Sequence, residues 1–84
     1  MGYELNKKER KKLIYLYEEY IKDTKDEFIR KNSWDLISTD DFFFTPAVER
    51  AGNATVNIFN GKLPIKKAKE ILKELKEEER EEHL

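Results

Sequence analysis

The sequence predicts an all-α fold, and three observations carry the prediction. Apolar residues recur at helical spacing in the first third of the chain and again after residue 64. Each periodic segment begins at a capping box or a proline. A competing strand pattern is confined to one short segment between them. We therefore expect one domain over residues 1–84, with two long antiparallel helices at about 6–31 and 64–82 and short helices packed between them.

The first long helix is predicted from its start signal and its apolar face. Asn6 followed by Glu9 has the spacing of a capping box. The residues after it that keep helical phase on one face are Leu13, Tyr17, Tyr20, Ile21, Thr24 and Phe28.

A second cap is available inside this segment, where Thr24 precedes Glu27 at capping-box spacing. The apolar phase does not slip there, so we expect one helix to about residue 31, bent near Asp23. Tyr15 and Ile29 then fall on the opposite, exposed face.

Two short helices are predicted in the middle of the chain. Thr45 followed by Pro46 is a strong helix start, and Gly52 is expected to stop that helix after one or two turns. We expect a second short helix from Asn53 to Asn60, closed by Gly61.

The alternative is an α+β fold with a short hairpin around Asn60-Gly61, which is a common hairpin turn. Pairing across that turn would place Pro64 opposite Asn57, in a hydrogen-bonded pair to which proline cannot donate. The helix is therefore preferred.

The last helix is predicted to open at Pro64 and to bury one apolar stripe. Its members are Ile65, Ala68, Ile71, Leu72 and Leu75. After them the chain is charged from Lys76 to His83, and we expect this end to be solvated and frayed. The residues predicted to form the core are Leu13, Tyr17, Tyr20, Phe28, Ile71 and Leu72.

The charges at the ends of both long helices oppose the helix dipole. Basic residues are concentrated at the N-terminal end of each helix, and acidic residues at the C-terminal end of the last helix. Antiparallel packing would compensate them, so we expect residues 7–12 to lie near residues 76–82. Helix pairing within one chain and pairing between two chains would both compensate these charges. The pattern therefore does not distinguish a monomer from a homodimer.

Composition narrows the function classes. Charged residues make up 42% of the 84 residues, the net charge is −1 and there is no cysteine. No secretory signal or membrane span is apparent, so a cytoplasmic protein is expected. The single histidine, His83, lies in the charged tail, and no metal or cofactor motif is present. We expect a protein that is not an enzyme, with no cofactor and no metal.

Binding to another protein is the predicted function, in an interaction or regulatory role. Aromatic residues are concentrated in the middle of the chain, and aromatics carry much interface energy. The three consecutive phenylalanines of residues 42–44 cannot all point in one direction. At least one of them should therefore be exposed, and Phe43 is the one that we expect. The predicted partner-binding residues are Phe43, Trp34, Tyr15, Phe42 and Phe44.

The alternative function is a small DNA-binding regulator of helix-turn-helix type. Residues 51–62 loosely echo that pattern, with a glycine turn and a closing Asn60-Gly61-Lys62. The side chains that would contact DNA are Asn53, Thr55, Asn57 and Lys62. The segment has almost no cations for phosphates, which normally supply most of the affinity.

Overall fold

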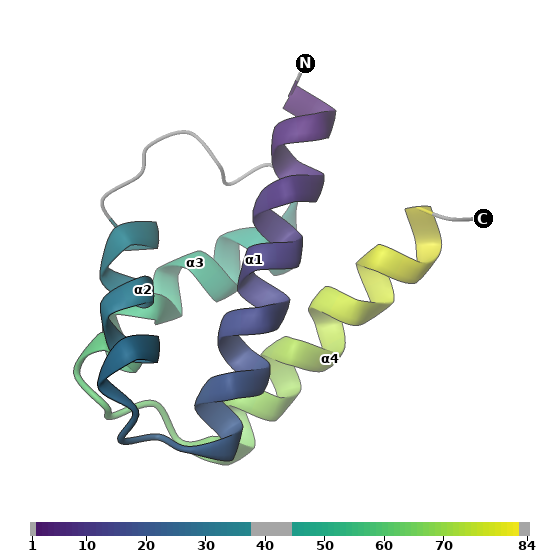
Figure 1. The fold of residues 1–84 in the computed structure, drawn as a ribbon. Coiled ribbons are helices and arrows are strands. Elements are labelled where there is room, and N and C mark those ends of the chain that lie inside the picture. Colours follow the sequence, from purple (N-terminus) through teal and green to yellow (C-terminus); the bar gives the residue numbers. More distant parts are fainter. Residues whose placement is uncertain (1, 38–44, 83–84) are drawn as a thin grey trace.

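The computed structural model describes the backbone of residues 2–37 and 45–82 and the side chains of residues 10–33 and 45–81. Within this part the chain forms helices and no strand, which confirms the all-α prediction and rules out the hairpin around Asn60-Gly61 (Figure 1). The helices are α1 (Gly2–Lys22), α2 (Glu27–Ile37), α3 (Pro46–Phe59) and α4 (Ile65–Glu82).

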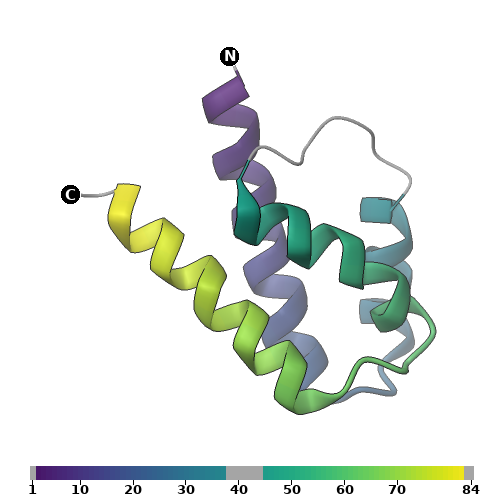
Figure 2. The same ribbon diagram turned by 180° about the vertical axis from the view of Figure 1, so that it is seen from behind.

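Helices α1 and α3 each contact all the other helices, whereas α2 and α4 do not contact each other. Helix α2 lies on one side of α1 and α4 lies on the other. Helix α3 crosses behind them in the view of Figure 1 and in front of them in Figure 2. The shared core draws on every helix and on the turn before α4; its buried apolar members are Leu13, Leu16, Tyr17, Tyr20, Ile29, Ala47, Val48, Ala51, Ala54, Ile58, Leu63, Ala68, Ile71 and Leu75.

The predicted single helix over residues 6–31 is wrong. Helix α1 begins earlier, at Gly2, and ends at Lys22, and α2 begins at Glu27. The Asp26 carboxylate accepts hydrogen bonds from the backbone N–H groups of Phe28 (2.9 Å) and Ile29 (3.4 Å), which makes Asp26 the N-cap of α2. The two predicted long antiparallel helices are therefore not formed as one continuous pair, because the first is broken in two.

This break reverses the predicted burial of two neighbouring side chains. Phe28, predicted to be in the core, is 65% exposed, and Ile29, predicted to be outside, is only 2% exposed. Ile29 follows Tyr20, the preceding large core residue, by nine positions, which in a continuous helix would be half a turn out of phase. The chain must leave the helix to bring Ile29 inside.

Gly52 does not stop a helix. Helix α3 runs unbroken through it, so the two predicted short helices are one. The start at Thr45-Pro46 is confirmed, with the Thr45 hydroxyl accepting from the Val48 N–H at 3.3 Å. The end at Gly61 is also confirmed: Gly61 has φ +69°, in the left-handed region that favours glycine.

Polar side chains from α1 and α2 tie the helices to the backbone of α3 and its exit turn. The buried hydroxyls of Tyr17 and Tyr20 donate to the carbonyls of Ala51 (2.7 Å) and Leu63 (2.8 Å). The Arg30 guanidinium donates to the carbonyl of Phe59 at 2.8 Å, near the C-terminal end of α3. Because these carbonyls are specific points along the chain, the bonds set where each helix crosses α3.

Helix α4 keeps most of its predicted stripe. Ala68, Ile71 and Leu75 are buried, whereas Leu72 is only partly buried and Ile65 is 45% exposed. The end of α4 is not the solvated, frayed segment expected, since the helix continues to Glu82 and two of its glutamates dock on the body.

These two glutamates bind α1 and the start of α3. Glu79 forms an ion pair of 2.7 Å with Arg10, whose side chain is 0% exposed. Glu78 accepts from the Thr45 hydroxyl at 2.6 Å and from the Ala47 N–H at 3.2 Å, where the α3 dipole favours an anion. Residues 7–12 and 76–82 thus meet as expected, at Arg10, within one chain.

Candidate protein-binding surface

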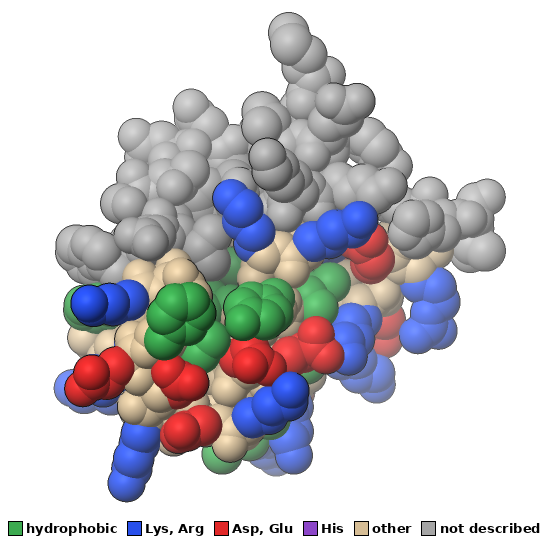
Figure 3. Space-filling model, in the orientation of Figure 1, with side chains coloured by type: hydrophobic (Ala, Val, Ile, Leu, Met, Phe, Trp, Pro, Cys, Tyr) green, Lys and Arg blue, Asp and Glu red, His purple; other side chains and the backbone are tan. Residues whose placement is uncertain are grey.

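Two large aromatic side chains stand exposed on the face formed by α1 and α2. Tyr15, near the middle of α1, is 53% exposed, and Phe28, in the first turn of α2, is 65% exposed. Hydrophobic side chains gather on this face where the two helices lie side by side (Figure 3). We call the surface made by Tyr15 and Phe28 the aromatic face.

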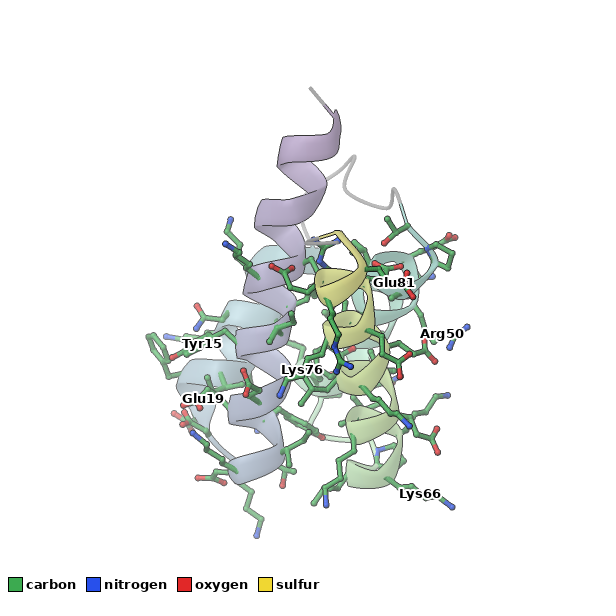
Figure 4. All side chains as sticks on the ribbon, turned by 90° about the vertical axis from the view of Figure 1, so that its right-hand side faces the viewer. Tyr15, Glu19, Arg50, Lys66, Lys76 and Glu81 are labelled. Atoms are coloured by element: carbon green, nitrogen blue, oxygen red, sulfur yellow. The ribbon has the colours of Figure 1, made fainter. Side chains whose placement is uncertain are left out.

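The local sequence explains why Tyr15 points outward. Leu13, Leu16, Tyr17 and Tyr20 all turn into the core, and Tyr15 lies on the opposite side of the same helix. Figure 4 shows its ring projecting away from α4, toward the face seen in Figure 1. An exposed aromatic at this position is therefore imposed by the helical phase of the core.

The charges one turn along α1 from Tyr15 are paired with other protein groups. Glu19 accepts from Lys22 at 2.9 Å, and this bond raises the pKa of Lys22. Glu18 lies 3.5 Å from Lys76 of α4. Exposed pairs of this kind add little stability, but they neutralise the edge of the aromatic face and leave its rings as the distinctive feature.

Phe28 is exposed because of the cap that precedes it. Lys25 donates its N–H to the Asp23 carboxylate at 2.9 Å, which closes the turn after α1, and Asp26 then starts α2. Sequence reasoning placed Phe28 in the core and missed it as a surface residue. The available signal was Asp26, a residue type strongly preferred at N-caps.

The structure describes the side chains of only some of the predicted partner-binding residues. Tyr15 is exposed, as predicted. Trp34 lies within α2, but its side chain is outside the described part. Phe42, Phe43 and Phe44 also lie outside the described residues, so the predicted splitting of these rings stays a prediction.

The predicted nucleic-acid residues do not form the expected motif. The echo of a helix-turn-helix needs a turn at Gly52, and α3 passes through that residue without one. Thr55 is 0% exposed and its hydroxyl donates to the Gly52 carbonyl at 2.6 Å, so it cannot reach a base edge. Asn53, Asn57 and Lys62 are exposed, and DNA binding through them stays a prediction.

The described residues include no group of three or more metal-ligating side chains that could hold an ion. Among the described helices, none has an apolar run long enough to cross a bilayer. No protein-family model matches the chain, and neither a curated protein nor a solved structure shows significant similarity to it.

Proposed function

We propose that this chain is a non-enzymatic interaction or regulatory protein that binds another protein through the aromatic face. The observation that carries the proposal is the exposure of both Tyr15 and Phe28 on adjoining helices. Aromatic side chains are enriched at interface centres, where they bury much apolar area with few rotatable bonds. Two such rings on one side of an 84-residue chain favour a partner that covers them.

The scaffold under the aromatic face suits binding better than chemistry. Both rings project from helices that are anchored in the core through other residues, namely Tyr17 and Tyr20 in α1 and Ile29 in α2. A rigid base lowers the ordering cost of association. A surface of this kind offers positioned contacts to a partner.

A matched pair of double variants tests the proposal. Tyr15→Ser with Phe28→Ser removes the aromatic face, whereas Val56→Ser with Ile65→Ser removes two exposed apolar side chains, 44% and 45% exposed, from α3 and α4. Immobilised wild-type protein and both variants are compared for retention of proteins from a lysate of the source organism. We expect the same retained species with wild type and the control pair, and its loss with the aromatic pair.

Three outcomes would contradict the proposal. The first is retention that survives removal of both rings. The second is a loss of binding accompanied by a fall in melting temperature, which would make the rings structural. The third is salt-sensitive binding of random duplex DNA, which would favour the DNA-binding alternative. Sedimentation of wild type and the aromatic pair separates a homodimer from a different partner.

A further inference from the structure

Helix α4 carries a row of cations along one side. Lys69, Lys73, Lys76 and Arg80 follow one another at spacings of four, three and four residues, which keeps them on one side of a helix. At a rise of about 1.5 Å per residue the row extends over roughly 16 Å. Figure 4 shows the labelled Lys76 reaching from α4 toward α1. We call these four residues the basic row.

Three acids of α4, namely Glu74, Glu78 and Glu79, have partners elsewhere in the chain, which most of the row lacks. Glu74 pairs with Arg50 of α3, and Glu78 and Glu79 hold Thr45 and Arg10. Within the row, Lys76 lies 3.5 Å from Glu18. Lys69, Lys73 and Arg80 have no ion pair with any side chain of the described part.

Two pairs of like charges within the row are unfavourable to the helix itself. Lys69 and Lys73, and Lys76 and Arg80, are like-charged pairs at i,i+4 spacing, which destabilise a helix by a few tenths of a kcal/mol each. An anionic partner laid along the row would relieve all of these repulsions at once.

An apolar hollow lies within the same row. It has a volume of about 280 Å³ and is lined by the basic row together with Leu72 and Glu77. Leu72 is only partly buried against the core. Its remaining surface and the aliphatic stems of the lysines give the hollow an apolar lining beneath charged tips.

We propose that this surface binds an acidic polypeptide segment that carries an apolar anchor residue. Carboxylates of the segment would pair with Lys69, Lys73 and Arg80, and the anchor would enter the hollow over Leu72. An amphipathic helix with acidic and apolar rows has this chemistry, and helices commonly bind grooves in this way.

Nucleic acid fits the surface less well. Glu77 lines the hollow, and Glu70 and Glu81 lie on the neighbouring side of the same helix. A phosphate backbone carries negative charge at every step and would meet all three glutamates. The apolar hollow would also gain nothing from phosphates.

This inference does not depend on the proposed function, because the basic row belongs to α4 and the aromatic face to α1 and α2. The test uses a fluorescent peptide of about 18 residues, long enough to span the row as a helix, with adjacent rows of glutamate and leucine. Comparison ligands are the same peptide with every leucine replaced by glutamine, and a random duplex DNA. Affinities are measured by fluorescence anisotropy at two salt concentrations.

Two triple variants of equal charge change provide the contrast. Lys69→Gln, Lys73→Gln and Arg80→Gln remove most of the basic row, whereas the control replaces three exposed lysines of α1, α2 and the turn between them, by Lys11→Gln, Lys25→Gln and Lys31→Gln. We expect the row variant to bind the peptide about tenfold more weakly, as the sum of three exposed ion pairs. The control should change affinity by less than about twofold, because screening limits the reach of remote charges.

The leucine-free peptide should bind more weakly to wild type, and the variant Tyr15→Ser/Phe28→Ser should bind the original peptide like wild type. That last result would hold even if the aromatic face proved to have no partner. Absence of peptide binding would overturn the proposal, as would an equal loss in both triple variants or binding that needs no leucine. Binding of the duplex in preference to the peptide would assign the row to nucleic acid instead.

Discussion

Two segments of this chain contradict their strongest local signals in opposite directions. Between Lys22 and Glu27 the apolar pattern predicts a continuous helix, and the chain breaks. At Gly52 the glycine predicts a break, and the helix continues. Together the two segments show where contacts in the core override a local sequence signal and where they agree with it.

The burial pattern distinguishes the two segments. On both sides of Gly52 the fully buried residues of α3 are Val48, Ala51, Thr55 and Ile58, at spacings of three, four and three. That phase fits a single helix, so core contacts outweigh the roughly 0.5–1 kcal/mol that an interior glycine costs. No such phase joins Tyr20 to Ile29, and Asp26 supplies a cap where the phase fails. A helix therefore continues where both its flanks bury in one phase.

The largest expected effect on stability is at Ile29, the residue that the break in the helix brings into the core. Ile29→Ala should lower the free energy of unfolding by about 2–5 kcal/mol, because the side chain is 2% exposed within the core. Urea denaturation followed by circular dichroism measures this. A loss below about 0.5 kcal/mol, the usual size of a surface effect, would mean that residues 22–27 do not serve to bury Ile29.

A second prediction concerns the bond beside Gly52. Tyr17→Phe removes the hydroxyl that donates to Ala51 and should cost about 1 kcal/mol, the usual net value of an internal hydrogen bond. The same denaturation measurement applies. Tyr15→Phe, at an exposed ring, is the control and should leave stability unchanged within about 0.5 kcal/mol.

Two buried tyrosines, Tyr17 and Tyr20, predict that the protein loses stability at alkaline pH. Burial raises the pKa of both Tyr17 and Tyr20 above the ordinary range. In the unfolded chain these phenols ionise near pH 10, and in the folded protein they resist ionisation. Their contribution is therefore present below about pH 10 and is lost as the pH rises above it. Melting temperatures from pH 8 upward should fall less steeply in Tyr17→Phe than in wild type, and parallel curves would contradict the assignment.

The cap at Asp26 is expected to contribute about as much stability as the Tyr17 hydrogen bond. Asp26→Ala removes the acceptor for the N–H groups of Phe28 and Ile29 and should cost about 1 kcal/mol. Asp26→Asn, which keeps the acceptor oxygen, should cost much less. If both variants match wild type in chemical denaturation, the break at this point is decided by Ile29 alone.

The smallest expected effect is at Phe28, next to the most sensitive position. Phe28→Ala should change the free energy of unfolding by no more than about 0.5 kcal/mol, because the ring is 65% exposed. Partner binding, measured as retention from lysate, should nevertheless weaken. A cost as large as that of Ile29→Ala would show that the ring is packed in solution, and the aromatic face would then lose its main member.

The sequence by itself determined the helical class and the sharpest boundaries. Thr45-Pro46 and Asn60-Gly61 each act through their own backbone and side-chain geometry, by a cap and by a left-handed residue, so they need no distant contact. Most of the α1 and α4 core positions follow from periodicity alone. Tyr15 was also identified as exposed from its place opposite the apolar stripe.

The tertiary structure decided the outcome wherever two local signals competed. Phe28 and Ile29 are neighbours of similar hydrophobicity, and the packing of α2 against the rest, after the cap at Asp26, determines which is buried. Gly52 stays helical because α3 is buried on both sides of it. Glu78 and Glu79 became docking residues instead of a solvated end because Thr45 and Arg10 lie within reach. These choices depend on partners distant in sequence, whose positions a local pattern does not contain.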